Sequence, residues 1–181
     1  MNTALLIVDM QEVLMPLVWR GEELADRIAS LAQRAREHEV PVVAIQQIGA
    51  TGTMFDPESP GTRLADRLDL RPTDVVLRKT ATDAFYGTNL APMLLEWDVD
   101  TVVLAGVATD YCVDATARSS LSHGLDVVLV GDGHAPAAEG DAEAGLSAEQ
   151  IIDRHNRILS TAIHPGGSVQ VRPAAEVVFT S

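Results

Sequence analysis

The sequence contains little cysteine, few aromatic residues and few basic residues, and each shortage excludes a class of protein. Its single cysteine, Cys112, can form neither an intramolecular disulfide nor a multi-cysteine metal site. Aromatic residues make up only 4% of the chain, so a buried core must consist mainly of Leu, Val, Ile and Ala. The 13 basic against 26 acidic residues give a formal net charge of −13. This charge disfavours a nucleic-acid partner, because phosphate binding depends on clustered Lys and Arg.

The sequence also lacks a long apolar run. No stretch approaches the roughly 20 residues that a helix needs to cross a bilayer, so we expect no membrane partner. The apolar stretch Ala4–Val8 follows no basic region and is too short for a signal peptide, which favours a cytoplasmic location. The 181 residues suffice for one domain with its own core, and we expect a single domain over residues 1–181.

Short apolar segments rich in β-branched residues alternate along the chain with segments of helical periodicity. The apolar segments show no alternation with polar residues, which is typical of strands covered on both faces, as in a parallel sheet. Strands alternating with helices predict an α/β fold, a three-layer α/β/α domain with a doubly wound sheet. The predicted strands are Ala4–Val8, Val40–Gln46, Val75–Leu77, Thr101–Ala105, Asp126–Val130 and Val169–Val171, and the helical patterns fall within Gly21–Glu39, Thr88–Trp97, Asp110–His123 and Ser147–Thr161.

Residues at the helix ends support two of these helices. Ser147–Gln150 has the Ser-x-x-Gln pattern of a capping box, and Gly124 occupies the position after a helix that favours glycine. Two long segments, Gly49–Gly61 and Gly131–Leu146, are predicted to be loops. Because long loops in compact α/β folds often form lids or binding sites, we expect these two to determine specificity.

Three residues with catalytic chemistry fall at the carboxyl ends of predicted strands, where open α/β sheets bind their ligands. Asp9 follows the first strand, Lys79 follows the third, and Cys112 lies just past the fourth. Each has an ordinary structural explanation. Asp is common in turns, Lys is usually a solvated charge, and a lone Cys is often a small buried apolar residue. Their convergence on one edge of the sheet favours a shared catalytic role.

The segment Gly106–Val113 (GVATDYCV) indicates how Cys112 would react. The strand ends in a glycine, turns sharply and places Cys112 in the first turn of a helix, where unpaired backbone N–H groups stabilise a thiolate. The same N–H groups could bind the oxyanion of a tetrahedral intermediate. With Asp9 as the base that accepts the thiol proton and Lys79 as the cation that holds both anions, a nucleophilic site forms without a histidine.

Three blocks of sequence resemble the signature blocks of the isochorismatase-like cysteine hydrolases, in the order found in that family. They are Ala4–Gln11 (ALLIVDMQ), Arg78–Leu90 (RKTATDAFYGTNL) and Gly106–Val113. A fourth piece, Asp132–His134 together with Leu146–Asn156, resembles a subset of uncharacterised members. The resemblance covers nearly the whole chain, and three correctly spaced blocks are far more specific than any one of them.

The resemblance implies a six-stranded, mostly parallel sheet and a catalytic triad of Asp9, Lys79 and Cys112. It also implies a cis peptide bond at Val107–Ala108 and an oxyanion hole formed by the backbone N–H groups of Ala108 and Cys112. In the implied cycle, Asp9 deprotonates Cys112, the thiolate attacks an amide-like carbonyl, Asp9 protonates the leaving nitrogen, and water hydrolyses the thioester. Family members are often dimers or tetramers, so we expect a homo-oligomer that acts on a small molecule without a cofactor.

Two departures from family relatives narrow the chemistry. The nicotinamidases of the family carry an Asp-x-His metal motif after the second strand, and Gln46–Asp56 contains no histidine, so we expect no metal. The siderophore-pathway isochorismatases, which hydrolyse a vinyl ether, typically lack the cysteine nucleophile. Cys112 therefore favours a C–N bond in an amide, lactam, ureido or carbamoyl compound. Two alternatives remain open: a family member that acts on a C–O bond, and a non-catalytic small-molecule binder whose triad is idle.

Three further residues are candidates for contact with the substrate. Phe85 matches a family position that commonly lines the substrate site, although a core phenylalanine has equal weight. His134 follows a strand and an Asp-Gly turn, so it either lines the pocket or belongs to a surface loop. Gln11 is expected to support the loop after the first strand. His155 and Asn156, on the last predicted helix, are expected to pack within the fold rather than reach the reaction centre.

Overall fold

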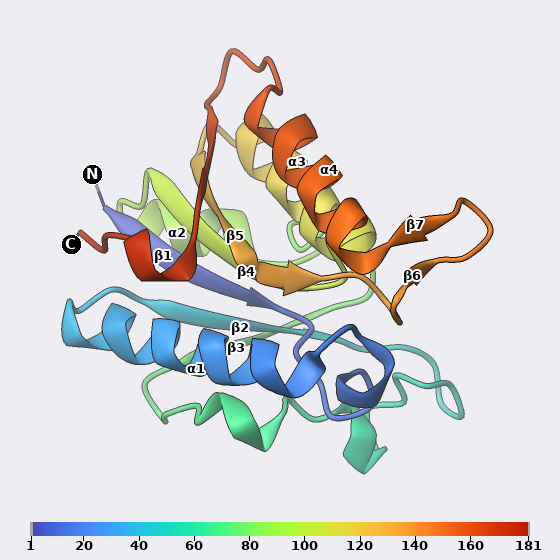
Figure 1. Cartoon of the computed structure of the whole chain (residues 1–181). Helices are drawn as coiled ribbons and strands as arrows, with labels where there is room; N and C mark the ends of the chain where they lie inside the picture. Colours follow the sequence, from blue (N-terminus) through green and yellow to red (C-terminus); the bar gives the residue numbers. More distant parts are fainter. Residues whose placement is uncertain (1, 181) are drawn as a thin grey trace.

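Six parallel strands form the sheet at the centre of the computed structural model, which describes residues 2–180 (Figure 1). Their order is β3-β2-β1-β4-β5-β8, and every neighbouring pair runs parallel. The prediction of a six-stranded, mostly parallel sheet is therefore confirmed. The strands are β1 (Thr3–Val8), β2 (Val42–Gln47), β3 (Val75–Lys79), β4 (Thr101–Val107), β5 (Asp126–Ala135) and β8 (Val169–Arg172).

Helices cover both faces of this sheet and complete the predicted three layers (Figure 1). α1 packs on one face, whereas α2, α3 and α4 pack on the other. Among the described residues, no helix is long and apolar enough to cross a bilayer. The helices are α1 (Gly21–Glu37), α2 (Leu90–Glu96), α3 (Asp114–Ser122) and α4 (Ala148–Ser160), with a π-helical turn η4 (Thr109–Val113) and short 3-10 turns η1 (Met15–Leu17), η2 (Pro60–Thr62), η3 (Asp66–Leu68) and η5 (Ala174–Glu176).

Strand β1 shows why the predicted strands are apolar without alternation. Its side chains point to the two faces in turn: Leu5 and Ile7 pack in the core under α1, whereas Leu6 and Val8 pack in the core under the other three helices. All four side chains are fully buried, and each contributes roughly 1.5–3 kcal/mol relative to an exposed position. Residues 4–8 of the strand are all apolar because neither face meets water.

The helix ends confirm two predictions and correct a third. Ser147 and Gln150 form the predicted capping box at the start of α4, each side chain accepting a hydrogen bond from the backbone N–H of the other. Gly124 follows α3 with a φ of 79°, the left-handed conformation that favours glycine there. The helix predicted to begin at Asp110 instead starts as the π-helical turn η4 and becomes α-helical only at Asp114.

The prediction of one long loop over Gly131–Leu146 is wrong in part. β5 does not end at Val130 but continues to Ala135, because its last residues pair with the end of β4 after an irregularity in the register. The remainder turns back as a short hairpin that projects from the sheet edge (Figure 1). Its two strands are β6 (Gly140–Asp141) and β7 (Leu146–Ser147), paired antiparallel.

Candidate active site

Asp9, Lys79 and Cys112 meet at the carboxyl edge of the sheet although they come from three different strands. The strand order reverses between β1 and β4, and this reversal is the usual place for a ligand in an open α/β sheet. Asp9 follows β1, Cys112 lies in the turn after β4, and Lys79 is the last residue of β3. The Lys79 Nζ atom lies 2.7 Å from Asp9 Oδ2 and 3.3 Å from Cys112 Sγ. The structure therefore brings the three predicted residues into one contact cluster.

The Lys79 ammonium has a complete set of oxygen partners. Its side chain is 0% exposed, and Nζ lies 2.7 Å from Asp9 Oδ2, 2.6 Å from Gln47 Oε1 and 2.9 Å from the Ala81 carbonyl oxygen. An ammonium group carries three N–H donors, so these three oxygens and the Cys112 sulfur, 3.3 Å away, share all of them. The cation is buried without an unsatisfied donor, and its charge is balanced by Asp9.

Gln47 is the member of this cluster that the sequence did not single out. It ends β2, which lies between β1 and β3, and it pairs directly with Lys79 in the sheet. Gln11 holds its backbone: Gln11 Oε1 accepts the Gln47 N–H at 2.9 Å, and Gln11 Nε2 donates to the Gln47 carbonyl at 3.0 Å and to Thr62 at 2.7 Å. The sequence signal that could have identified Gln47 was its place among polar residues at the carboxyl end of an apolar strand. Gln11 is fully buried in this role, so it supports the site and does not line it.

The Asp9 carboxylate is buried and has one oxygen available. Its side chain is 3% exposed, and its backbone adopts a φ of 51°. Oδ2 pairs with Lys79, whereas Oδ1 has no hydrogen-bond partner among the described residues. Burial raises the pKa of Asp9 above its usual range, and the nearby Lys79 charge opposes that rise. A carboxylate with a raised pKa is a stronger base, and Oδ1 is the atom that can accept a proton.

The environment of Cys112 corrects the expectation that its place at a helix start stabilises the thiolate. Burial raises the pKa of the Cys112 thiol to about 12, and the Asp9 charge adds to the effect while Lys79 opposes it. The turn is also less positive than an open α-helix end, because the N–H groups of Tyr111 and Val113 both donate to the Ala108 carbonyl at 3.1 Å. Cys112 therefore rests as a thiol whose proton must be removed during reaction.

The backbone before Cys112 has two special features. The peptide bond between Val107 and Ala108 is cis, at the position that the family resemblance implies. Gly106 adopts a φ of 126°, and a Cβ atom built on it would lie only 2.1 Å from the Val8 carbonyl oxygen. Only glycine lets β4 approach β1 this closely, and the approach brings the turn that carries Cys112 next to Asp9.

Asp9 and Cys112 line a pocket of about 340 Å³. The side chains of Leu14, Phe55, Val107 and Tyr111 form much of its wall, and Gln47, Ala108 and residues 80–82 complete it. Phe55 comes from the segment Gly49–Gly61, which was expected to determine specificity. Within the described part of the chain, the other expected loop, Gly131–Leu146, contributes no residue to this wall. No group of three or more His, Cys, Asp or Glu side chains placed to hold a metal ion occurs among residues 2–180.

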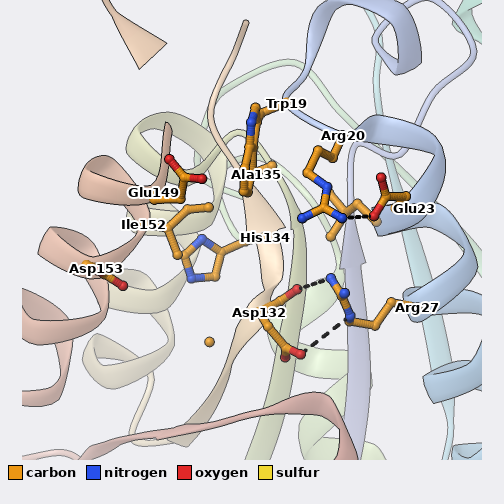
Figure 2. A pocket seen from close by; sticks show the side chains of 12 residues that line it. Trp19, Arg20, Glu23, Arg27, Asp132, His134, Ala135, Glu149, Ile152 and Asp153 are labelled. Atoms are coloured by element: carbon orange, nitrogen blue, oxygen red, sulfur yellow. Dashed lines mark hydrogen bonds and ion pairs between the residues drawn. The ribbon is translucent and has the colours of Figure 1, made fainter. Parts of the chain in front are cut away.

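Two residues predicted to contact the substrate lie elsewhere. Phe85 is 7% exposed and stacks on His123, with ring centroids 4.5 Å apart, and it is not part of the Cys112 pocket. His134 lines a different pocket of about 260 Å³ between α1 and α4 (Figure 2). There its ring lies beside Ile152, and the Arg27–Asp132 ion pair joins α1 to β5. Phe85 thus packs as the core phenylalanine that was its alternative, whereas His134 is buried and does not lie in a surface loop.

His134 is nevertheless connected to the turn that carries Cys112. Its Nδ1 lies 2.9 Å from Thr109 Oγ1, and its Nε2 lies 2.9 Å from Asn156 Oδ1. Asn156 uses its amide N–H to bond the Gly131 carbonyl, so Oδ1 accepts the His134 Nε2–H and Nδ1 accepts the Thr109 hydroxyl proton. Burial lowers the pKa of His134 to about 4, which keeps this arrangement neutral. Asn156 packs within the fold as expected, while its contact with His134 went unpredicted.

Comparison with known proteins agrees with the resemblance of the sequence blocks. The family model described as an isochorismatase domain matches residues 3–162. A streptothricin hydrolase of Streptomyces noursei is 37% identical over 145 residues, covering 76% of this chain and 57% of that protein. A maleamate amidohydrolase of Pseudomonas putida is 43% identical over 70 residues, which are 36% of this chain and 33% of that protein.

The fold also matches a solved structure, a cysteine hydrolase from Pseudomonas syringae pv. phaseolicola 1448A. The two agree with a TM-score of 0.80 and 26% identity, over 97% of this chain and 90% of that chain. The curated relatives differ more in length, because this chain spans only about half of the streptothricin hydrolases, 57% of one and 49% of another. Their activities therefore inform a proposal for this chain and do not establish one.

Proposed function

The chain belongs to the isochorismatase family, and from that premise we propose that it is a hydrolase that cleaves a C–N bond in a small molecule through Cys112. The bond is an amide, lactam, ureido or carbamoyl linkage. The observation that carries the proposal is the contact cluster of Asp9, Lys79 and Cys112 at the wall of a pocket. The similar proteins support it, since one is a streptothricin hydrolase, one an amidohydrolase and one a cysteine hydrolase.

In the first step, Asp9 Oδ1 accepts the thiol proton of Cys112 as the sulfur attacks the carbonyl carbon. The C–S bond forms, and the carbonyl oxygen becomes an oxyanion. We assign the oxyanion to the backbone N–H groups of Ala108 and Cys112, which border the same pocket. Because the thiol pKa is raised by burial, proton transfer and attack are coupled and no stable thiolate precedes the substrate.

In the second step, the oxyanion collapses and the C–N bond breaks. The protonated Asp9 gives its proton to the leaving nitrogen, and a thioester remains on Cys112. The nitrogen departs as ammonia or an amine, or stays tethered to the acyl group as an amine when a lactam ring opens. Water then attacks the thioester while Asp9 accepts a proton from it. The C–S bond breaks, the carboxylic acid product leaves, and Cys112 recovers its thiol proton from Asp9.

Lys79 has an electrostatic role in this scheme. Its ammonium lies within contact of the Asp9 carboxylate and of the Cys112 sulfur. When the proton moves from sulfur to Asp9, the C–S bond forms and the negative charge passes through the sulfur to the carbonyl oxygen. The fixed cation therefore stabilises the Asp9 carboxylate before the transfer and the partial negative charge on the sulfur during it, without rearrangement.

The test is to trap the acyl-enzyme. Small amides, ureido acids, lactams and carbamoyl compounds are screened for release of ammonia or amine, or for ring opening in the case of lactams. An active compound is then mixed with the protein and quenched in acid. Intact mass spectrometry should then show an acyl adduct on wild type and none on Cys112→Ala, which should also lose turnover. Turnover that survives in Cys112→Ala, or cleavage of a vinyl ether without an adduct, would contradict covalent C–N hydrolysis.

A further inference from the structure

We infer that the Cys112 pocket accepts an acyl group that is uncharged and apolar, and that it rejects acyl groups bearing a carboxylate. This inference rests on the proposed function and assigns its substrate class. It concerns the part of the substrate that stays on the sulfur as a thioester, because that part occupies the pocket next to Cys112.

The first support is the state of Lys79, which among residues 2–180 is the cation in contact with the reaction centre. Within the described chain, the pocket wall includes no Arg, Lys or His side chain. Lys79 touches the Cys112 sulfur from behind that wall, but its side chain is 0% exposed, and its three donors are shared among Asp9, Gln47, Ala81 and that sulfur. It has no donor left for a substrate carboxylate.

The second support is the charge that does face the pocket. Asp9 is the one carboxylate in the wall, and its Oδ1 atom has no hydrogen-bond partner in the described structure. A substrate carboxylate would leave water beside an Asp9 charge that Lys79 already balances, and it would find no cation free to pair with it. The cost of transferring an unpaired anion away from water therefore opposes its binding.

The third support is the chemistry of the wall. Leu14, Phe55, Val107 and Tyr111 offer aliphatic and aromatic surface to whatever fills the volume of about 340 Å³. Such surface favours an alkyl, alkenyl or aryl acyl group by burial of apolar area. The pocket thus predicts a preference opposite to that expected of a maleamate amidohydrolase, whose substrate carries a carboxylate, despite the 43% identity over 70 residues.

Maleamide and maleamate provide a matched test, because they differ only in a carboxamide in place of a carboxylate. We expect kcat/KM for maleamide to exceed that for maleamate by at least about 100-fold, after division by two for its equivalent amides. Ammonia release measures both. Hydrolysis of maleamate at an equal or higher rate would overturn the inference while leaving C–N hydrolysis by Cys112 intact.

A variant that supplies the missing cation sharpens this test. Tyr111 lines the pocket and is 61% exposed, so Tyr111→Arg should fold and should lower the maleamide-to-maleamate ratio by about tenfold or more. Tyr86→Arg is the matched control, since Tyr86 is 71% exposed and is not in the pocket wall. A ratio that changes equally in both variants would point to general surface charge and contradict a role for the pocket.

Alkylation of Cys112 tests charge selection without any turnover. Iodoacetamide and iodoacetate differ by the same amide-for-carboxylate exchange, and each alkylates the sulfur with loss of iodide. At pH 9 we expect the rate ratio of iodoacetamide to iodoacetate to exceed that of glutathione by at least about tenfold. A ratio at or below that of glutathione overturns the inference. If the expected ratio is found but no amide yields an acyl adduct, the proposed function fails and the charge selection of the pocket stands.

Discussion

The buried pair between Asp9 and Lys79 gives the sharpest prediction, because the two side chains are 3% and 0% exposed and lie 2.7 Å apart. Asp9→Asn keeps the shape of the carboxylate but removes the proton acceptor. A general base contributes about 10²–10⁴-fold, so kcat/KM should fall by at least about 100-fold. The same change leaves a buried ammonium without its counter-ion, and breaking such a pair costs about 3–5 kcal/mol. Gln47 and Ala81 still bind the ammonium, so we expect the lower end of that range for the loss of stability.

The double variant separates the charge pair from ordinary packing. Lys79→Met should also destabilise the protein, because it leaves the Asp9 carboxylate buried without a cation. Asp9→Asn combined with Lys79→Met removes both charges, so its loss of stability should be smaller than the sum of the two single losses by about 1–3 kcal/mol. Activity should stay as low as in Asp9→Asn alone, because residues that act as one unit do not lose activity multiplicatively.

The assays are urea unfolding at pH 7.5 for stability and kcat/KM on the best amide from the screen for activity. Asp26→Asn is the control, since its partner Arg67 is a solvated surface residue and the exposed pair contributes little. Stability losses that simply add, together with an Asp9→Asn enzyme within tenfold of wild type, would refute the buried charge pair as the basis of the site. Losses of stability that add, together with a loss of activity in Asp9→Asn, would refute only the expected interaction energy of the Asp9–Lys79 pair.

Three further predictions each depend on one structural feature. Burial raises the pKa of the Cys112 thiol to about 12, so Cys112 should react with iodoacetamide more slowly than glutathione does at pH 7. Its alkylation rate should keep rising beyond pH 9, and a rate that levels off below pH 8 would contradict this. The pKa of His134, lowered by burial from 6.5 to about 4, means that stability should decrease as the pH falls from 6.5 towards 4, since the unfolded chain takes up the proton first. His134→Gln should weaken that dependence between pH 7.5 and 5 in urea unfolding, and an unchanged dependence would count against it. Gly106→Ala should destabilise the protein far more than Gly124→Ala. A Cβ at Gly106 would lie 2.1 Å from the Val8 carbonyl oxygen, whereas a Cβ at Gly124 would have no surrounding described atom within 4 Å. Equal shifts in melting temperature in the two variants would argue against the close approach of β4 to β1.

Local patterns in the sequence were sufficient for the six strands of the sheet, for most of the helices and for the three residues of the cluster. Apolar segments such as Ala4–Val8 predict strands buried on both faces, and the capping box at Ser147 predicts the start of α4, because both depend on neighbours along the chain. Asp9, Lys79 and Cys112 could be grouped because parallel strands end at one edge of a sheet. That inference needs the strand direction and no side-chain geometry.

Tertiary structure alone decided the environment of those residues. Gln47 joins the cluster only because β2 lies between β1 and β3, and a strand order of this kind is not encoded in any short segment. The raised pKa of the Cys112 thiol depends on burial and on a carboxylate more than 100 positions earlier, so a local argument from a helix end predicted the opposite. His134 faces another pocket because β5 runs five residues further than its apolar segment, carried by pairing with β4. Properties set by chain neighbours are readable from sequence, whereas burial and charge at the site depend on residues that only folding brings together.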